Sequence, residues 1–530
     1  MLSLPMHGSA KAWYSYPIPL CVERIKRIRC AMCVRATTEG HVDILLANPL
    51  FVWHDPVEKA LMTPYFPLGL LYLAAVLRQN DYSVAVYDGA FEQDYSGFEQ
   101  ALIRYQPKVV GITALITVRR NALALAEIAK RHGATVIFGG PDPTGKPEAY
   151  LRHTGADGKR AVDLVVWDEG EVTIIELMNH LTGRNGADLL SLHGIRGLRF
   201  LDEQGEIVST PPRPAITDMD SIPFPARDLV DFSAYQKHWT ARHGYWSMSM
   251  INTRGCPYAC TWCQKGIFGR SYRSRSAANA AEEMRLIKEH YNPDQIRVVD
   301  DITGVDRKWV FEWRAEVLKR NASIPFECLS RVNLVDVPLL KALQEIGCQK
   351  IYFGAESGSQ KVLNAMKKGT KVEQIYRAAE ACREVGIHVY FFMMVGYPGE
   401  ELDDLHASVR MLVEALPDSF STTIAYPLPG TEFYQQVRGR ILHDGDDWAF
   451  TAENKLLFER GKHNTHFYRW VQRWFNKEWE AARLKAGKLQ VSPLKRARIM
   501  AGLQVSRRVV QVLAKLPGGG TVEFHPAPGR

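Results

Sequence analysis

The chain contains no apolar run near the roughly 20 residues that a helix needs to cross a bilayer, although 46% of its 530 residues are hydrophobic. Its N-terminal segment also lacks the apolar stretch and small-residue cleavage site of a secretory signal. These absences argue against an integral membrane protein and against secretion. A chain of this length is expected to form two or three globular domains.

Cysteine is scarce and unevenly placed. There are nine cysteines, an odd number, and none lies between residues 34 and 255. This usage predicts a reducing compartment, the cytoplasm, rather than a framework of disulfide bonds.

Basic charge is confined to the two ends of the chain. Residues 1–38 carry six Lys or Arg and one acid, residues 460–530 carry fifteen and three, and the remainder is net acidic although the whole chain is +8. A nucleic-acid enzyme would more often have a basic core, so we expect no nucleic-acid partner. Residues 1–38 lack clear periodicity and are predicted to be a disordered basic extension, despite a C-x2-C pair at Cys30 and Cys33.

Residues 39–200 show strands alternating with helices, a pattern typical of an α/β fold with a doubly wound, Rossmann-like parallel sheet. Such a sheet binds its ligand beyond the carboxyl ends of the strands. The predicted strands are residues 42–48, 83–88, 109–113, 134–138 and 162–166, and the predicted helices are 67–77, 119–131 and 171–181.

The rest of the chain divides into three further segments. A short polar hairpin begins near residue 182, and the repeated prolines of residues 201–245 predict a linker that wraps between domains. Residues 246–445 return to α/β alternation, and residues 446–530 are predicted to be helical. The six strands expected in the second α/β domain are residues 246–252, 295–301, 326–331, 350–354, 389–395 and 421–425.

Three cysteines, Cys256, Cys260 and Cys263, form a C-x3-C-x2-C motif directly after the first of these six strands. Three thiolates on one loop can bind three irons of a [4Fe–4S] cluster and leave the fourth iron open to a substrate or cofactor, whereas electron-transfer clusters normally have four cysteines. A structural zinc site is the alternative. It is disfavoured because zinc prefers four closed ligands and no second C-x2-C follows.

With Trp262 just before the third cysteine, this loop resembles that of the radical S-adenosylmethionine (SAM) superfamily. The resemblance implies a partial (β/α)6 barrel, which agrees with the six strands. It also implies that the open iron chelates SAM, and that one electron from an external flavodoxin- or ferredoxin-like reductant cleaves SAM to a 5′-deoxyadenosyl radical.

The resemblance places the SAM contacts at the carboxyl ends of the barrel strands. Two structural alternatives remain open, namely that Asp300 caps the following helix and that Glu356 pairs with Lys350. The implied contacts are Trp262 beside the cluster, Asp300 and Asp301 for the SAM ammonium, Arg331 for its carboxylate, Glu356 or Ser357 for the ribose, and Gly396 and Pro398 for the adenine.

The strand ends of the first domain resemble the cobalamin-binding domain found upstream of many radical SAM enzymes. Paired glycines after a strand let a bulky ligand approach the backbone. The D-x-H-x-x-G motif that supplies a cobalt ligand is missing, so the cobalamin tail is expected along the Thr113 and Gly139 strands with no histidine on cobalt; His54, the nearest alternative ligand, is interpreted as a surface residue. The implied contacts are Pro67, Leu68, Gly69, Thr113, Leu115, Gly139, Gly140, Pro141, Glu169 and Gly170.

Two apolar patterns occupy the C-terminal region. Phe467, Trp470, Val471, Trp474 and Phe475 recur at helical spacing and are interpreted as core on the barrel mouth, with a substrate-lining role as the alternative.

Further on, the polar residues Gln504, Arg507, Arg508, Gln511 and Lys515 lie opposite the apolar residues Val505, Val509, Val512 and Leu516. Such a basic amphipathic helix can lie on an anionic membrane. Docking on the protein itself is the favoured interpretation, and peripheral membrane contact is the alternative.

Together these features resemble the cobalamin-dependent radical SAM class, which includes the magnesium-protoporphyrin ester cyclase and radical methyltransferases. The resemblance implies methylation of an unactivated carbon of a small molecule through the adenosyl radical and methylcobalamin. Oxidative cyclisation or rearrangement of a hydrophobic, tetrapyrrole-like substrate is the alternative. A tRNA methylthiotransferase is set aside because residues 34–255 contain no cysteine, and a non-catalytic cobalamin-binding protein is disfavoured by the intact cysteine motif.

Overall fold

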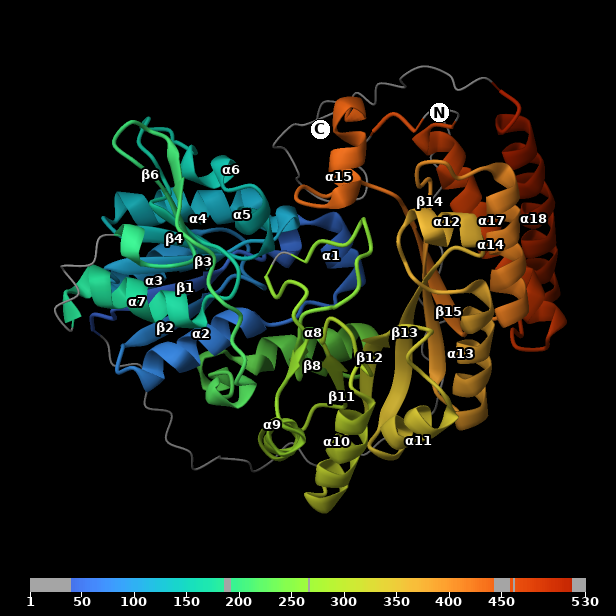
Figure 1. Ribbon diagram of the computed structural model, residues 1–530, viewed down its shortest axis with the longest axis horizontal. Helices are drawn as coiled ribbons and strands as arrows, with labels where there is room; N and C mark the ends of the chain where they lie inside the picture. Colours follow the sequence, from blue (N-terminus) through green and yellow to red (C-terminus); the bar gives the residue numbers. More distant parts are fainter. Residues whose placement is uncertain (1–39, 185–191, 266, 443–457, 461–462, 517–530) are drawn as a thin grey trace.

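The computed structural model describes residues 40–184, 192–265, 267–442, 458–460 and 463–516 (Figure 1). The basic extension expected at residues 1–38 lies outside this part of the chain, as does much of the segment joining the barrel to the C-terminal helices. Within the described residues, two α/β domains stand side by side and a pair of long helices lines the outer edge of the second.

The first domain contains a seven-stranded sheet with the order β2-β1-β3-β4-β5-β6-β7. The first five of these strands are parallel, and β6 and β7 extend the sheet as an antiparallel hairpin. This is the predicted polar hairpin, which here joins the sheet and passes the expected boundary at residue 200. The strands are β1 (Ile44–Asn48), β2 (Val84–Asp88), β3 (Val109–Thr113), β4 (Thr135–Gly139), β5 (Leu164–Val166), β6 (Leu198–Leu201) and β7 (Ile207–Ser209).

Helices cover both faces of this sheet, because its central strands are apolar on both sides. The helices α2 (Leu68–Gln79) and α7 (Glu171–Thr182) close one core, and α3 (Ser96–Tyr105), α4 (Arg119–Arg131) and α6 (Glu148–Leu151) close the other. Two short helices, α1 (Pro56–Leu61) and α5 (Pro141–Gly145), lie at the carboxyl ends of the strands. Strand order reverses between β1 and β3, which is the place where doubly wound sheets bind ligands.

The segment predicted to be a linker contains a helix that the prolines concealed, α8 (Phe232–His243). Asp231 caps its first turn and Gly244 ends it in a left-handed conformation. Two of its aromatic side chains hold the first domain, since Tyr235 donates to Asp88 Oδ2 at 2.7 Å and Trp239 Nε1 donates to the Pro64 carbonyl at 2.8 Å.

The second domain is an open barrel of six parallel strands in the order β15-β14-β13-β12-β11-β8. All six predicted strands are present. They are β8 (Ser247–Met250), β11 (Gln295–Val298), β12 (Phe326–Ser330), β13 (Cys348–Glu356), β14 (His388–Val395) and β15 (Ser419–Ile424). The helices of this domain are α9 (Ala277–His290), α10 (Arg307–Lys319), α11 (Val337–Glu345), α12 (Gln360–Ala365), α13 (Val372–Val385), α14 (Leu402–Ala415) and α15 (Glu432–Val437).

Outward strand residues such as Ile351, Phe353 and Phe391 are fully buried beneath the barrel helices. Inward residues alternate with them and are only half-buried, including Tyr352 and Phe392. The barrel therefore has a packed outer layer and an accessible, partly polar lumen.

Two long helices complete the described chain. The first, α17 (Thr465–Lys485), packs against α14 and β15, and α18 (Pro493–Leu513) packs on α17. Phe467, Val471, Trp474 and Phe475 are buried, so their interpretation as core is confirmed, although they cover the outer edge strand rather than the mouth. Among the described helices, none has both the length and the apolarity required to span a membrane.

The favoured interpretation of the last helix, in which its apolar stripe docks on the protein, is wrong. Val505, Val512 and Leu516 are exposed, and the buried side of α18 is formed by Ile499, Leu503 and Val510. The sequence misleads here because this helix carries apolar residues on two opposite faces.

Candidate active site

The three motif cysteines lie on the loop between two short antiparallel strands, β9 (Thr253–Arg254) and β10 (Arg273–Ser274). All three side chains are half-buried and none forms a disulfide. Gly255 begins the loop at φ +82°, where a Cβ atom would lie 2.1 Å from the Ser271 carbonyl oxygen, so only glycine fits. A short loop with three free thiols at this spacing fits a cluster in which each thiolate binds a different iron.

Within the described residues, no three His, Cys, Asp or Glu side chains converge as the ligands of a single metal ion would.

Two adjacent aspartates at the end of β11 hold the backbone that leads into the cysteine loop. Asp300 Oδ1 accepts hydrogen bonds from the amides of Asn252 (2.6 Å) and Thr253 (3.0 Å), and Asp301 Oδ2 accepts one from Gly255 (2.8 Å). Burial raises the pKa of Asp300 to about 7. The alternative that Asp300 caps the next helix is wrong, since Asp306 caps α10.

Cations surround the thiols. Arg331 Nη1 donates to Cys260 Sγ at 3.5 Å, and its guanidinium lies 3.7 Å from the ring centroid of Tyr258. A second guanidinium nitrogen of Arg331 donates to the Lys368 carbonyl. Burial raises the pKa of Cys263 to about 11, and the nearby Lys368 opposes that shift. Positive charge beside these thiols would favour their thiolate forms, which are the forms that bind iron.

Glu356 at the end of β13 pairs with Lys368, whose Nζ lies 3.0 Å from Glu356 Oε1, and both side chains are buried. Pairing with Lys350 is therefore wrong, because Lys350 pairs with Glu327 at 3.3 Å. Glu356 has φ +62°, an uncommon conformation for a non-glycine residue and one that clusters at functional sites.

The remaining expected SAM contacts lie at the ends of β13 and β14. Ser357 is fully buried, and its hydroxyl bonds Ser408 of α14 at 3.0 Å. The amide of Gly396 donates to Glu400 Oε2 at 2.6 Å, and burial raises the pKa of Glu400 to about 8. Pro398 is half-buried at the rim, and Trp262 Nε1 is buried without a hydrogen-bond partner.

The carboxyl edge of the first sheet is built from small residues. At Gly140, φ is +110° and a Cβ atom would lie 2.7 Å from the Ala114 carbonyl oxygen. Thr113, Gly139 and Pro141 surround it at the ends of β3 and β4 and the start of α5. Leu115 is 54% exposed beside this close-packed backbone. The edge fits a bulky, flat ligand because its small residues let such a ligand approach the backbone.

The other expected cobalamin contacts divide between helix starts and the interface of the two domains. Pro67, Leu68 and Gly69 begin α2, and a Cβ atom at Gly69 would meet nothing within 4 Å. Gly170 precedes α7. Glu169, by contrast, is buried and accepts hydrogen bonds from Arg273 Nη1 at 2.7 and 2.8 Å, so its carboxylate is already engaged.

His54 lines a cavity of about 360 Å³ where the loops after β1 and β3 diverge. Its ring nitrogens lie 3.2 Å from Asn121 Oδ1 and 2.9 Å from the Gln93 carbonyl. Both nitrogens are therefore occupied, which fits the expectation that no histidine ligates cobalt.

A buried ion network that sequence analysis missed joins the two edges. Arg254, directly before the cysteine loop, is 2% exposed and donates to Glu171 at 2.5 Å. Arg273 donates to Glu169 from the other side of the loop. The cysteine loop is thus tied on both sides to the start of α7, and the two carboxyl edges face each other across it. The position of Arg254 beside the motif was the only sequence signal.

The barrel lumen is a second feature missed by sequence analysis. Glu327 accepts a hydrogen bond from Tyr352 at 2.8 Å and lies 3.7 Å from Arg297. Tyr352 and Phe392 stack with ring centroids 5.6 Å apart. Tyr65 of the first domain reaches this cluster, with the Arg297 guanidinium 5.1 Å from its ring centroid. Alternation of polar and apolar residues along β11 to β14 was the available signal.

Comparison with known proteins agrees with this geometry. The family model for the radical SAM superfamily matches residues 250–412, and the model for the B12 binding domain matches residues 60–178. The chain is 30% identical over 384 residues to an uncharacterized methyltransferase of Pyrococcus horikoshii, which covers 72% of this chain and 80% of that protein.

More distant relatives include a methyltransferase and a cyclase. The chain is 27% identical over 460 residues to the cytidylyl-2-hydroxyethylphosphonate methyltransferase of Streptomyces wedmorensis, covering 75% of this chain and 82% of the relative. It is 24% identical over 382 residues to the anaerobic magnesium-protoporphyrin IX monomethyl ester cyclase of Rubrivivax gelatinosus, covering 71% and 67%. The fold is similar to that of the radical SAM methyltransferase TsrM from Kitasatospora setae with cobalamin and a [4Fe–4S] cluster bound, with TM-score 0.63, 19% identity and coverage of 81% and 82%.

The protein is therefore an enzyme of the radical SAM superfamily, in the group that also carries a B12-binding domain. Its cofactors are a [4Fe–4S] cluster, SAM and cobalamin.

Proposed function

We propose that the protein methylates an unactivated carbon of its substrate. The observation that carries this proposal is the opposition of the two carboxyl edges, one built of small residues and one of cysteines and charged groups, across the Arg254–Glu171 pair. Cobalamin supplies methyl-carrier chemistry, and the cluster with SAM supplies a carbon radical. The relatives named as methyltransferases support this assignment.

The roles of individual residues follow from their placement. Cys256, Cys260 and Cys263 are proposed as the cluster ligands. Asp300 and Asp301 mainly fix the backbone that leads into the loop, because their carboxylates accept hydrogen bonds from its amides. Direct contact with the SAM ammonium is a secondary role. Arg331 and the Glu356–Lys368 pair present charged groups for the SAM carboxylate and ribose. Trp262, Ser357, Gly396 and Pro398 complete the proposed SAM site.

The cobalamin site is proposed at the small-residue edge. Thr113, Leu115, Gly139, Gly140 and Pro141 border the face of the ligand. Pro67, Leu68, Gly69 and Gly170 border its rim, whereas Glu169 fixes the domain interface.

The substrate is proposed to enter the barrel lumen. There Tyr65, Tyr352 and Phe392 provide ring faces, and Arg297 and Glu327 provide a hydrogen-bonding floor. Apart from Tyr65, these side chains lie on strands β11 to β14 of the barrel, so a bound carbon would be shielded from water by rings while it reacts.

We propose that the enzyme works in the cytoplasm with an external flavodoxin- or ferredoxin-like reductant and with no nucleic-acid partner. The half-buried cysteine loop leaves a path for electrons from outside. We propose α18 as the site of a peripheral membrane contact, because Val505 and Val512 are exposed on this helix.

Product analysis of the anaerobically reconstituted full chain, given cobalamin, SAM and a reductant, tests the proposal. We expect both 5′-deoxyadenosine and S-adenosylhomocysteine, because methylation uses one SAM for the radical and one for the methyl group. Deoxyadenosine without S-adenosylhomocysteine would instead support oxidative cyclisation, the activity for which the Rubrivivax gelatinosus relative is named. Neither product from a protein with an intact cluster would contradict both.

A further inference from the structure

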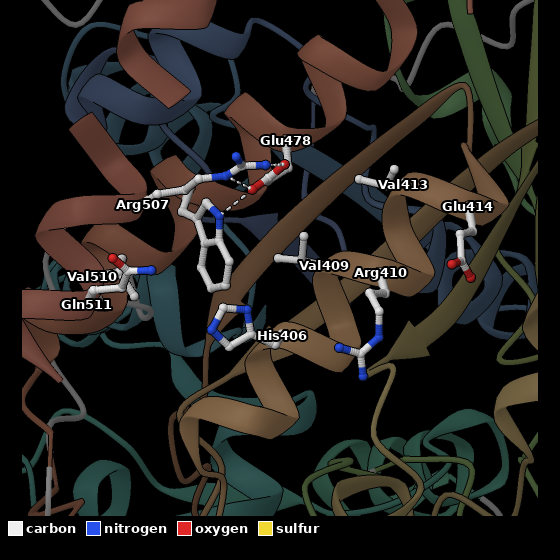
Figure 2. Close-up of a pocket in the computed structure, with 10 residues that line it drawn as sticks. His406, Val409, Arg410, Val413, Glu414, Glu478, Arg507, Val510 and Gln511 are labelled. Carbon is white, nitrogen blue, oxygen red and sulfur yellow. Dashed lines mark hydrogen bonds and ion pairs between the residues drawn. The ribbon is translucent and has the colours of Figure 1, made fainter. Parts of the chain in front are cut away.

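The rotation of α18 about its own axis is fixed by an ion pair with α17 in which Glu478 is buried and Arg507 is exposed. Arg507 donates to both carboxylate oxygens of Glu478 on α17, at 2.6 and 2.7 Å, and Trp474 Nε1 donates to the same carboxylate at 2.7 Å (Figure 2). These groups border a cavity of about 440 Å³ between α14, α17 and α18. A bidentate charged pair has a defined geometry, so the opposite face of α18 is held toward solvent.

That solvent-facing side carries a row of large apolar side chains. Leu494 is 64% exposed, Val505 52%, Val512 59% and Leu516 52%. Leu494, Val505 and Val512 are separated by nearly whole numbers of helical turns, so they lie on one face of α18, and Leu516 follows just after the helix ends. Single exposed apolar residues are ordinary on protein surfaces, but a row along one helix marks an interaction site.

Positive charge borders this stripe. Residues 481–516 contain nine Lys or Arg and no Asp or Glu. Of these cations, Arg507 is neutralised by Glu478, whereas Lys495, Arg496, Arg498, Arg508 and Lys515 are exposed. An apolar stripe flanked by exposed cations is the surface pattern of helices that lie in the plane of an anionic bilayer.

We propose that α18 docks the enzyme on membranes that contain anionic phospholipids, with the apolar stripe at the headgroup boundary and the flanking cations on the phosphate groups. The proposal does not depend on the reaction catalysed. A second copy of the chain fits this surface less well, because its α18 would bring cations against cations. A protein electron donor must come close to the cysteine loop, whereas α18 lies at the outer edge of the barrel with α17 packed inside it (Figure 1).

Vesicle co-sedimentation of the full chain tests this docking. The protein should bind vesicles of phosphatidylcholine mixed with phosphatidylglycerol and should bind pure phosphatidylcholine at least tenfold more weakly. Each basic side chain near an anionic surface contributes about fivefold in affinity, so the charge reversal Arg498→Glu/Arg508→Glu should weaken binding more than tenfold. Raising the salt concentration should weaken binding of the unmodified protein.

A second variant separates the apolar stripe from simple charge attraction. Val505→Glu/Val512→Glu changes only exposed positions and should also weaken binding more than tenfold. Lys308→Glu/Leu318→Glu on α10 is the matched control, because both side chains are exposed on a helix at another surface. It should bind vesicles as the unmodified protein does, and circular dichroism should show that every variant is folded.

Three results would overturn the proposal. The first is vesicle binding that survives both α18 variants. The second is absence of vesicle binding with dimerisation that the α18 variants abolish. The third is absence of vesicle binding while the same variants slow reduction of the cluster by flavodoxin, which would make α18 a protein docking surface.

Discussion

The carboxyl edges of the two sheets face each other with opposite chemistry. The edge of the first domain is made of small residues, with Gly140 packed so closely on Ala114 that no side chain fits. The edge of the barrel carries thiols and buried charges, including Asp300, Arg331 and the Glu356–Lys368 pair. We propose that one edge accepts a ligand through its shape and that the other holds ligands through charge and covalent coordination. Substitutions at the first edge should therefore weaken ligand binding or stability through steric clashes. Substitutions at the second edge should do so through lost charge interactions or lost metal coordination.

Removing a thiol from the charged edge should have the largest effect. Cys260→Ala should lower 5′-deoxyadenosine formation more than about a thousandfold, since two thiolates cannot hold the cluster in place. Cys382→Ala is the matched control, because Cys382 is fully buried in the barrel core. The control should retain its iron and cost on the order of 1 kcal/mol of stability. Iron content and product yield measure both, and loss of iron from Cys382→Ala alone would contradict the assignment of the ligands.

Breaking the ion network between the edges should have the largest effect on stability. Glu171→Ala leaves Arg254 buried with a weakened set of partners, and loss of one member of a buried pair costs about 3 kcal/mol. Glu206→Ala removes an exposed pair with Arg152 and should cost less than about 0.5 kcal/mol. Denaturant unfolding measures the two values. Equal values would show that the edges are not held together by this network.

The steric character of the first edge is tested by Gly140→Ala. The added Cβ atom would clash with the Ala114 carbonyl and the backbone has φ +110°, so we expect a loss of about 2 kcal/mol in stability. Cobalamin affinity should fall about tenfold, the factor that corresponds to 1.4 kcal/mol. The control is Gly97→Ala in α3, where the atoms nearest to the added Cβ belong to the flexible Glu92 side chain. This variant should lower neither the stability nor the cobalamin affinity. Calorimetry and absorbance titration would detect the difference.

At the barrel edge, Glu400→Gln should change how stability depends on pH. Burial raises the pKa of Glu400 in the folded protein to about 8, whereas its ordinary value of 4.5 applies in the unfolded chain. Between these values the folded protein binds a proton that the unfolded chain releases, so the contribution of Glu400 to the free energy of unfolding falls as pH rises and stays low above pH 8.

The variant should therefore be more stable than the unmodified protein at pH 9, by up to about 5 kcal/mol, and the two should be close in stability near pH 5. Glu380→Gln, an exposed carboxylate on α13, should show no such pH-dependent difference. Thermal unfolding across this pH range provides the measurement, and a difference of the same size at both pH values would rule out titration of Glu400 as its cause.

Both sheets could be predicted from the sequence because their strands are short apolar runs separated by helices, and the cysteine spacing located the loop. The helix α8 could not, since prolines before it suggested an extended linker. The Arg254–Glu171 and Arg273–Glu169 pairs also could not, because no periodic pattern links residues so far apart in the chain. The buried face of α18 was predicted wrongly, because the helix has two apolar faces and the sequence does not indicate which of them packs against α17.

The central claim is that one chain holds its cluster and its cobalamin at facing edges. Electron paramagnetic resonance of the reconstituted protein, with the cluster reduced and cobalt in its paramagnetic divalent state, tests this most directly. We expect the signals of the cluster and of cobalt to interact, with broadening or splitting that is absent when either centre is omitted. A spectrum equal to the sum of two isolated centres, in a protein that retains both, would contradict it.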